Sequence, residues 1–211
     1  MGLSTAILVL SSLLTLTSSA LAQGQSQEKR HEGKCRLAHQ VLTKGQPAVK
    51  RDWALGYVSA CRELGGEALA AALRSHRTAV ARSDELTKLV VSTSLLIDRD
   101  VLNAALEVAS DPTAGRVARV EAIRILSFQI RPGTFAPYQA FVAPDSALSA
   151  PSTVSTGESP VVGEPLPDDA FDRVATILFD LADAPSTPEP VTVAAQSVAR
   201  QAAAQARDSG G

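Results

Sequence analysis

The stretch SDPTAGRVARVEAIRILSF, residues 110–128, combines a turn signal with the apolar spacing of a helix. The side chain of Asp111 can cap a helix, and Pro112 suits the first helical position because its missing N–H would lack a partner there. Behind them, apolar residues recur three and four positions apart, as they do on the buried face of a helix. The stretch therefore predicts a helix from Pro112 to Ile130, where the sequence Arg-Pro-Gly stops it.

The composition favours helices along the rest of the chain. Aromatic residues make up only 4%, and alanine, leucine and valine supply most of the apolar side chains. Alanine and leucine lose little rotamer freedom in a helix, and the alternation typical of strands is nearly absent. Gly65-Gly66 is expected to end one helix and Ser83 to cap another. The sequence predicts an all-α fold, with further helices over residues 35–44, 48–64, 67–77, 85–97, 101–109, from 168, and 191–207.

The first residues indicate export. An apolar core without a charged side chain before Glu28 is followed by Ala20-Leu21-Ala22, the small-x-small pattern that signal peptidase recognises. We expect residues 1–22 to be a signal peptide cleaved between Ala22 and Gln23, which would place the mature protein in the periplasm or outside the cell. The alternative is an uncleaved anchor, since a membrane span needs about 20 apolar residues.

The mature chain divides into five predicted segments. Residues 23–34 are polar and expected to form a flexible arm, and residues 35–130 a helical repeat-like domain. Residues 131–167 hold seven of the twelve prolines, which predicts a long loop or disordered insert in which only FAPYQAFVA is apolar enough to dock. A helix pair over 168–207 and a polar tail over 208–211 complete the chain.

The two cysteines, Cys35 and Cys61, both fall in the exported part of the chain. In an oxidising compartment an isolated pair is most simply a disulfide. It would close a loop of about 26 residues and stabilise the fold by roughly 3 kcal/mol. A metal site is not expected, because no C-x-x-C motif and no clustered histidine accompany the cysteines.

Three of the expected helices share a short pattern: a basic residue, a small or apolar residue three positions later, and an apolar residue four positions after that. Because the last two positions lie one turn apart, both are expected to pack inward, with the basic residue near the preceding turn. The units are spaced by 37 and 31 residues and consist of Arg51–Ala54–Val58, Lys88–Val91–Leu95 and Arg119–Ala122–Leu126.

The pattern resembles the HEAT-repeat superfamily, in which pairs of antiparallel helices stack into a right-handed solenoid. The best match has Asp111 in the turn, followed by Arg119, Ala122 and Leu126 at the family offsets. It departs from the family in having Ala118 where valine is usual, and the unit with Lys88 lacks the turn aspartate. The resemblance implies a short HEAT-like α-solenoid with an extended binding surface; the alternative is an irregular helical bundle.

Charge is distributed unevenly along the chain. Residues 23–82 carry 11 Lys/Arg against 5 Asp/Glu, whereas residues 131–211 carry 4 against 10. The basic part could face an anionic partner, or the two oppositely charged ends could attract each other. No aromatic residues interleave the basic stretch as in nucleic-acid binders, so we expect no nucleic-acid partner. Arg119 is assigned a structural position at the turn, while Arg116 and Arg124 are expected to be free for a partner.

Few residues suggest catalysis. No histidine has an acidic residue at metal-ligand spacing on its own helix. The acidic pairs at 98/100 and 168/169 suit helix starts, and Trp53 and Tyr57 suit core packing of the first hairpin. No phosphate-binding or serine-hydrolase motif occurs. We therefore expect no catalytic, cofactor or metal site; the histidines considered are His31, His39 and His76.

These observations predict an exported, non-enzymatic helical repeat-like scaffold that binds another protein or a peptide, requires no cofactor, and has no membrane contact after signal removal. The insert at 131–167 could act as a flap or tether. One alternative is a small exported enzyme whose site is assembled from dispersed residues, including His39 or His76. Another is a structural or stress-related envelope protein.

Overall fold

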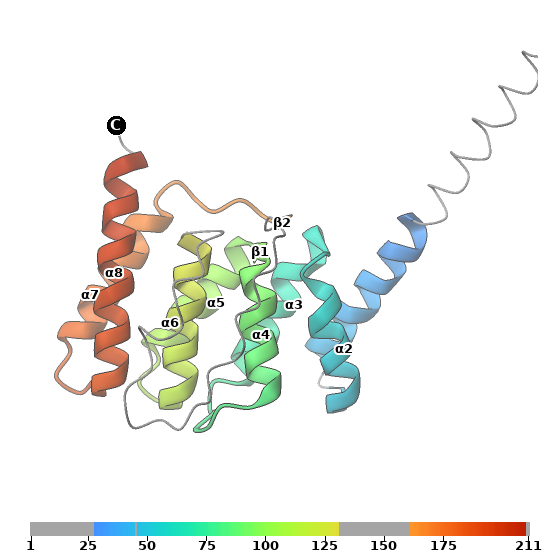
Figure 1. Cartoon of the computed structure of the whole chain (residues 1–211), viewed down its shortest axis with the longest axis horizontal. Coiled ribbons are helices and arrows are strands. Elements are labelled where there is room, and N and C mark those ends of the chain that lie inside the picture. The colour runs from blue at the N-terminus through green and yellow to red at the C-terminus, as the bar shows by residue number, and fades with distance from the viewer. Residues whose placement is uncertain (1–27, 45, 131–160, 210–211) are drawn as a thin grey trace, which may run out of the picture.

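The computed structural model describes residues 28–44, 46–130 and 161–209, and it is almost wholly helical, which confirms the all-α prediction (Figure 1). A first helix covers residues 28–43. The elements that follow it are α2 (Ala48–Val58), α3 (Arg62–Ser75), α4 (Asp84–Ser94), β1 (Leu96–Ile97), α5 (Arg99–Ser110), α6 (Arg116–Ile130), β2 (Val161–Val162), α7 (Ala170–Asp183) and α8 (Glu189–Ser209).

Several expectations lie outside the described residues. They are the signal peptide over 1–22, its cleavage between Ala22 and Gln23, the first part of the arm over 23–27, the insert over 131–160 with its FAPYQAFVA segment, and the last residues 210–211. In the described parts of the chain, no helix is both long and apolar enough to cross a membrane.

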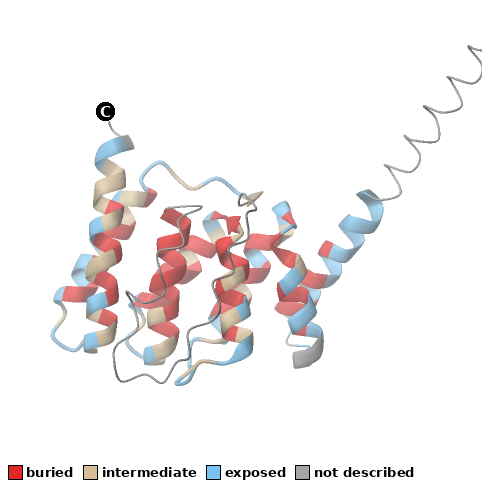
Figure 2. Cartoon of the chain, viewed as in Figure 1, coloured by how far each residue is buried: buried red, intermediate tan, exposed pale blue. Residues whose placement is uncertain are grey.

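The helices form two layers. Helices α2, α4, α6 and α8 lie in one row, each in contact with the next, and α3, α5 and α7 form a second row behind it. The first and last helix pairs therefore lie at opposite ends of the molecule (Figure 1). Burial is greatest in the middle, on α5 and α6, and the core lies between the rows (Figure 2).

The front row repeats one burial pattern, but the predicted register is wrong in the second unit. Lys88 is exposed, and Val91 and Leu95 are only half-buried. The inward face of α4 is instead carried by Leu86, Leu89, Val90 and Thr93. This set matches the buried positions 51, 54, 55 and 58 of α2 and 119, 122, 123 and 126 of α6. Leu86 therefore stands where α2 and α6 have a buried arginine, and the interval between units becomes 35 and 33 residues.

Gly65-Gly66 does not end a helix as predicted. Helix α2 stops at Val58, and both glycines lie inside α3. A Cβ on Gly65 would lie 2.7 Å from the carbonyl oxygen of Val58 and 2.8 Å from a methyl of Leu96, and one on Gly66 would overlap the carboxylate of Asp98. The two glycines are needed for close approach between elements rather than for a helix stop.

Helix α4 ends three residues before the predicted boundary at Ile97, because the chain turns there into a short strand. Leu96 and Ile97 pair in parallel with Val161 and Val162. Residues 161–167 of the expected insert are therefore docked rather than a free loop. The buried Asp98 side chain fixes this junction, since its two carboxylate oxygens accept hydrogen bonds from the backbone N–H groups of Asp100 and Glu164, both at 2.8 Å.

The turn before α6 also differs from the prediction. Helix α6 begins at Arg116 rather than at Pro112. Asp111 accepts hydrogen bonds from the backbone N–H of Thr113 at 2.8 Å and from its hydroxyl at 2.6 Å. These bonds lower the pKa of the Asp111 carboxyl below its ordinary value. Asp111-Pro112 thus shapes a separate turn ahead of the helix. Ser83, in contrast, caps α4 as predicted, accepting from the N–H of Leu86 at 3.1 Å.

Candidate functional site

At the N-terminal end of the molecule, a disulfide joins the first helix to the start of α3. Cys35 lies on the first helix and Cys61 immediately precedes α3, and the structure pairs them across a Cα–Cα distance of 5.6 Å. Both cysteines are buried. This agrees with the predicted staple. The expected flexible arm, however, is helical over residues 28–34, so the disulfide holds a continuous helix against the fold.

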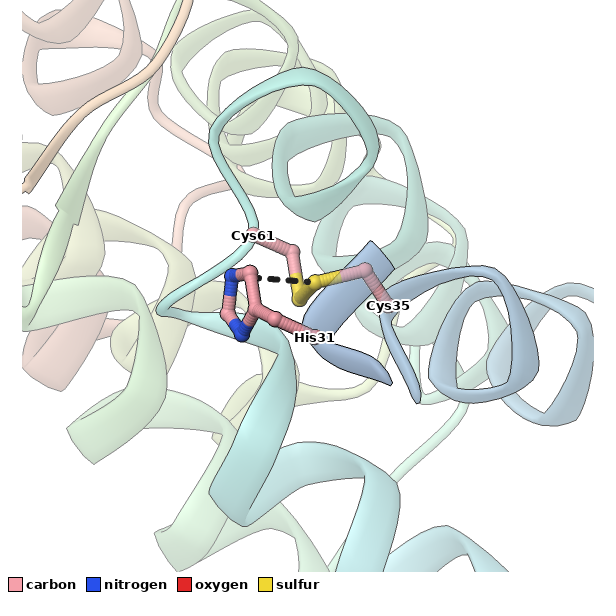
Figure 3. A group of neighbouring side chains, drawn as sticks. All are labelled: His31, Cys35 and Cys61. Carbon is pink, nitrogen blue, oxygen red and sulfur yellow. Dashed lines mark hydrogen bonds between the residues drawn. A yellow bond between two sulfur atoms is a disulfide. The ribbon is translucent and has the colours of Figure 1, made fainter. Parts of the chain in front are cut away.

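His31 lies one helical turn before Cys35 and points at the disulfide (Figure 3). Its Nε2 is 3.6 Å from Cys35 Sγ, and its Nδ1 is 2.6 Å from the hydroxyl of Tyr57. The ligand atoms of His31, Cys35 and Cys61 all lie within 4.8 Å of one another. The expectation that no histidine accompanies the cysteines is therefore wrong. The signal was the four-residue spacing of His31 and Cys35, which places both on one helix face only if the arm is helical.

Two aromatic side chains of α2 extend this cluster along the surface. The rings of Trp53 and Tyr57 are stacked, with centroids 5.7 Å apart and planes inclined by 13°. Lys34 of the first helix places its Nζ 5.6 Å from the centre of the Tyr57 ring. Trp53 is 42% exposed, so it lies on the surface and not in the predicted core of the first hairpin. Tyr57 is partly buried and packs against the core, as predicted.

A groove of about 550 Å³ runs beside Trp53, between the first helix and the start of α2. Leu37 is 52% exposed there. Two of the described residues that line the groove, Lys44 and Lys50, carry positive charge, and none of them is acidic. The full lining is Leu37, Gln40, Val41, Lys44, Gln46, Lys50 and Trp53.

The predicted repeat arginines take structural positions. Arg119 is buried, and its Nε donates to the carbonyl oxygen of Ala109 at the end of α5, at 3.0 Å. Burial lowers the pKa of the Arg119 guanidinium, and the charge of Asp111 partly offsets this. Arg51 likewise reaches the preceding helix, donating to the carbonyl oxygen of Leu42 at 3.5 Å. Ala54, Val58, Ala122 and Leu126 pack inward as predicted.

Other basic residues differ from expectation. Lys88 is exposed and paired with Asp52 of the neighbouring α2. Arg124 is not free for a partner: it is buried and donates to Glu121 Oε2 at 2.9 Å. Burial is the main cause that lowers the pKa of Arg124 to about 10. Arg116 alone of the two arginines proposed for a partner is exposed.

The two histidines considered for catalysis bridge helices. His39 Nε2 lies 2.9 Å from Glu67 Oε2 of α3. His76 lies at the end of α3, with Nδ1 3.0 Å from the carbonyl oxygen of Ala72 and Nε2 3.8 Å from Glu85 of α4. The structure therefore places them in separate interhelical contacts and does not bring them into one site.

Comparison with known proteins adds no relative: no family model, curated protein or solved structure matches this chain. At the N-terminal end of the molecule, exposed apolar groups, positive charge and the histidine–disulfide cluster lie together.

Proposed function

We propose that this protein is an exported, non-enzymatic scaffold of HEAT-like antiparallel helix pairs, and that the groove at its N-terminal end binds a peptide segment with apolar side chains and carboxylates. The observation that carries the proposal is the exposure of Leu37 and Trp53 beside two lysines in one groove.

The two-layer arrangement supports the scaffold. In stacked helix pairs each unit buries one face against its neighbours, and the terminal pair retains an open flank. Here α2 contacts α4 on one side, while the other side carries the groove. A HEAT-like stack accounts for the repeated burial pattern of α2, α4 and α6 and for the arginines that reach the preceding helix at Arg51 and Arg119.

The lining of the groove supports a peptide ligand. Concave sites that combine apolar groups with a few polar ones are typical of ligand binding, and tryptophan is enriched among residues that dominate interface energies. Because Lys44 and Lys50 supply the charge, a partner with acidic residues beside its apolar ones is favoured over a basic partner. Export is supported by the Cys35–Cys61 pair, since disulfides persist in oxidising compartments.

Trp53 supplies the test, because it is the chain's single tryptophan. We expect an amphipathic peptide with leucine on one face and glutamate on the other to shift Trp53 fluorescence to shorter wavelength as it excludes water. Added salt should weaken binding. A peptide with lysine in place of glutamate is the control ligand.

Matched protein variants distinguish binding in the groove from nonspecific attraction between the peptide and the net charge of the protein. The double variant Lys44→Glu with Lys50→Glu should weaken binding roughly tenfold or more. Arg116→Glu, which reverses an exposed charge on α6, should bind as the parent does. Equal binding of the acidic and basic peptides, or no fluorescence change with either, would refute the proposal.

A further inference from the structure

We infer that reduction of the Cys35–Cys61 disulfide opens a zinc site at this end of the molecule, with the two thiolates and His31 Nε2 as protein ligands and water in the fourth position. This inference is independent of the proposed peptide groove, because it depends only on the histidine–disulfide cluster.

The positions of the ligand atoms suit tetrahedral zinc. With a Zn–S distance of about 2.3 Å and a Zn–N distance of about 2.0–2.1 Å, a nitrogen and a sulfur ligand lie roughly 3.6 Å apart. His31 Nε2 and Cys35 Sγ are already 3.6 Å apart. All three ligand atoms lie within 4.8 Å of one another. Once the S–S bond is broken, the two sulfurs need only separate to roughly 3.8 Å by side-chain rotation.

The second nitrogen of the His31 ring has the partner that a metal-binding histidine requires. Tyr57 Oη lies 2.6 Å from Nδ1 and can accept its proton. When Nδ1–H donates to Tyr57, Nε2 is the nitrogen available to a metal, and it faces the cysteine sulfurs (Figure 3). The His31 side chain is exposed, so a hydrated ion can reach it, whereas the buried sulfurs close the site from the other side.

The chemistry balances with a dithiol as the reductant. The dithiol transfers two electrons and two protons to the disulfide, becomes a disulfide itself, and leaves Cys35 and Cys61 as thiols. Zinc then displaces the two thiol protons and is not itself reduced or oxidised. In the oxidised protein neither sulfur is a thiolate, so the site is closed. Zinc would replace the disulfide as the link between the first helix and the start of α3.

Cobalt(II) is the probe, since it occupies tetrahedral zinc sites and reports their geometry by its colour. We expect full-length protein reduced with a phosphine to give the visible bands of tetrahedral cobalt and thiolate-to-cobalt absorption, and zinc to displace both. The oxidised protein should give neither. An octahedral spectrum, or no spectrum, with the reduced protein would overturn the inference.

Variants assign the ligands. His31→Ala should lower cobalt affinity about tenfold or more, whereas His39→Ala, on the same helix but paired with Glu67, should not. Tyr57→Phe should weaken binding and keep the tetrahedral spectrum, because it removes only the hydroxyl that holds the His31 ring. Circular dichroism checks that each variant is folded. Unchanged affinity in a folded His31→Ala variant would contradict histidine ligation.

Discussion

Glu121 lies inside the molecule between two guanidinium groups. Its Oε2 accepts from Arg124 at 2.9 Å and lies 3.5 Å from Arg82, and the three side chains are at most 7% exposed. Burying charges is costly unless opposite charges compensate them. The carboxylate of Glu121 therefore compensates part of the charge of the two buried arginines.

We predict that Glu121→Gln lowers the free energy of unfolding by roughly 3 kcal/mol, because it removes the negative charge beside two buried cations. Urea denaturation measures the loss. Glu107→Gln is the matched control, since Glu107 pairs with Arg74 at 2.7 Å while both side chains are about half exposed, and it should change stability by less than about 0.5 kcal/mol. Equal losses in the two variants would show that burial is not the cause.

The sequence predicts the positions of some buried arginines and not of others. The positions of Arg51 and Arg119 near the preceding helix follow from the repeat spacing. The burial of Arg124 does not, because helical periodicity assumes one buried face and one solvated face. Helix α6 contacts α4, α5 and α8, so neighbours cover almost its whole circumference. Only the packing of the two helix layers shows which polar side chains of α6 become buried.

At the scale of elements, the junction of α3 with β1 depends on the absence of a side chain. Gly66 lies against the carboxylate of Asp98, which in turn holds the segment that contains β2. A two-residue strand whose partner lies more than sixty residues away has no local pattern that a sequence could reveal. The close packing of the two glycines is likewise a tertiary feature, so the sequence alone does not distinguish Gly65-Gly66 from a helix stop.

We predict that Gly66→Ala destabilises the protein by roughly 2 kcal/mol, because the new methyl group must displace the Asp98 carboxylate. Gly56→Ala is the matched control. It also replaces a helical glycine, but a Cβ at Gly56 meets nothing within 4 Å. Its higher helix propensity should stabilise α2 by about 0.5–1 kcal/mol. Thermal unfolding compares the two, and a loss of stability in both would count against close packing at Gly66.

At the scale of the whole molecule, the disulfide connects the first helix to the remaining stack. Reduction with a phosphine in the presence of a chelator, which excludes any metal contribution, should lower stability by roughly 3 kcal/mol for a loop of this length. The thermal midpoint measures the change. The Cys35→Ser/Cys61→Ser variant should resemble the reduced protein, and its midpoint should not respond to reductant. An unchanged midpoint on reduction of the parent would contradict a stabilising link.

The composition of the sequence predicts the all-α architecture. The expected export to an oxidising compartment predicts the pairing of the two cysteines. Neither predicts the groove, because it arises where Leu37 of the first helix and Trp53 of α2 come together, and a pattern of apolar residues cannot distinguish a covered stripe from an open one. This ambiguity is greatest at the end of a row of helices, where α2 contacts α4 on one side and the groove lies on the other. Two lysines of the basic N-terminal part, Lys44 and Lys50, line this groove.

Exchange of charge between groove and peptide tests the central claim most directly. In a titration followed by Trp53 fluorescence, the parent should prefer the amphipathic peptide with glutamates, and the Lys44→Glu/Lys50→Glu variant should prefer the same peptide with lysines. A reversed order of affinities places the peptide in the groove beside those two side chains. An unchanged order, with the variant still preferring the acidic peptide, would contradict the account.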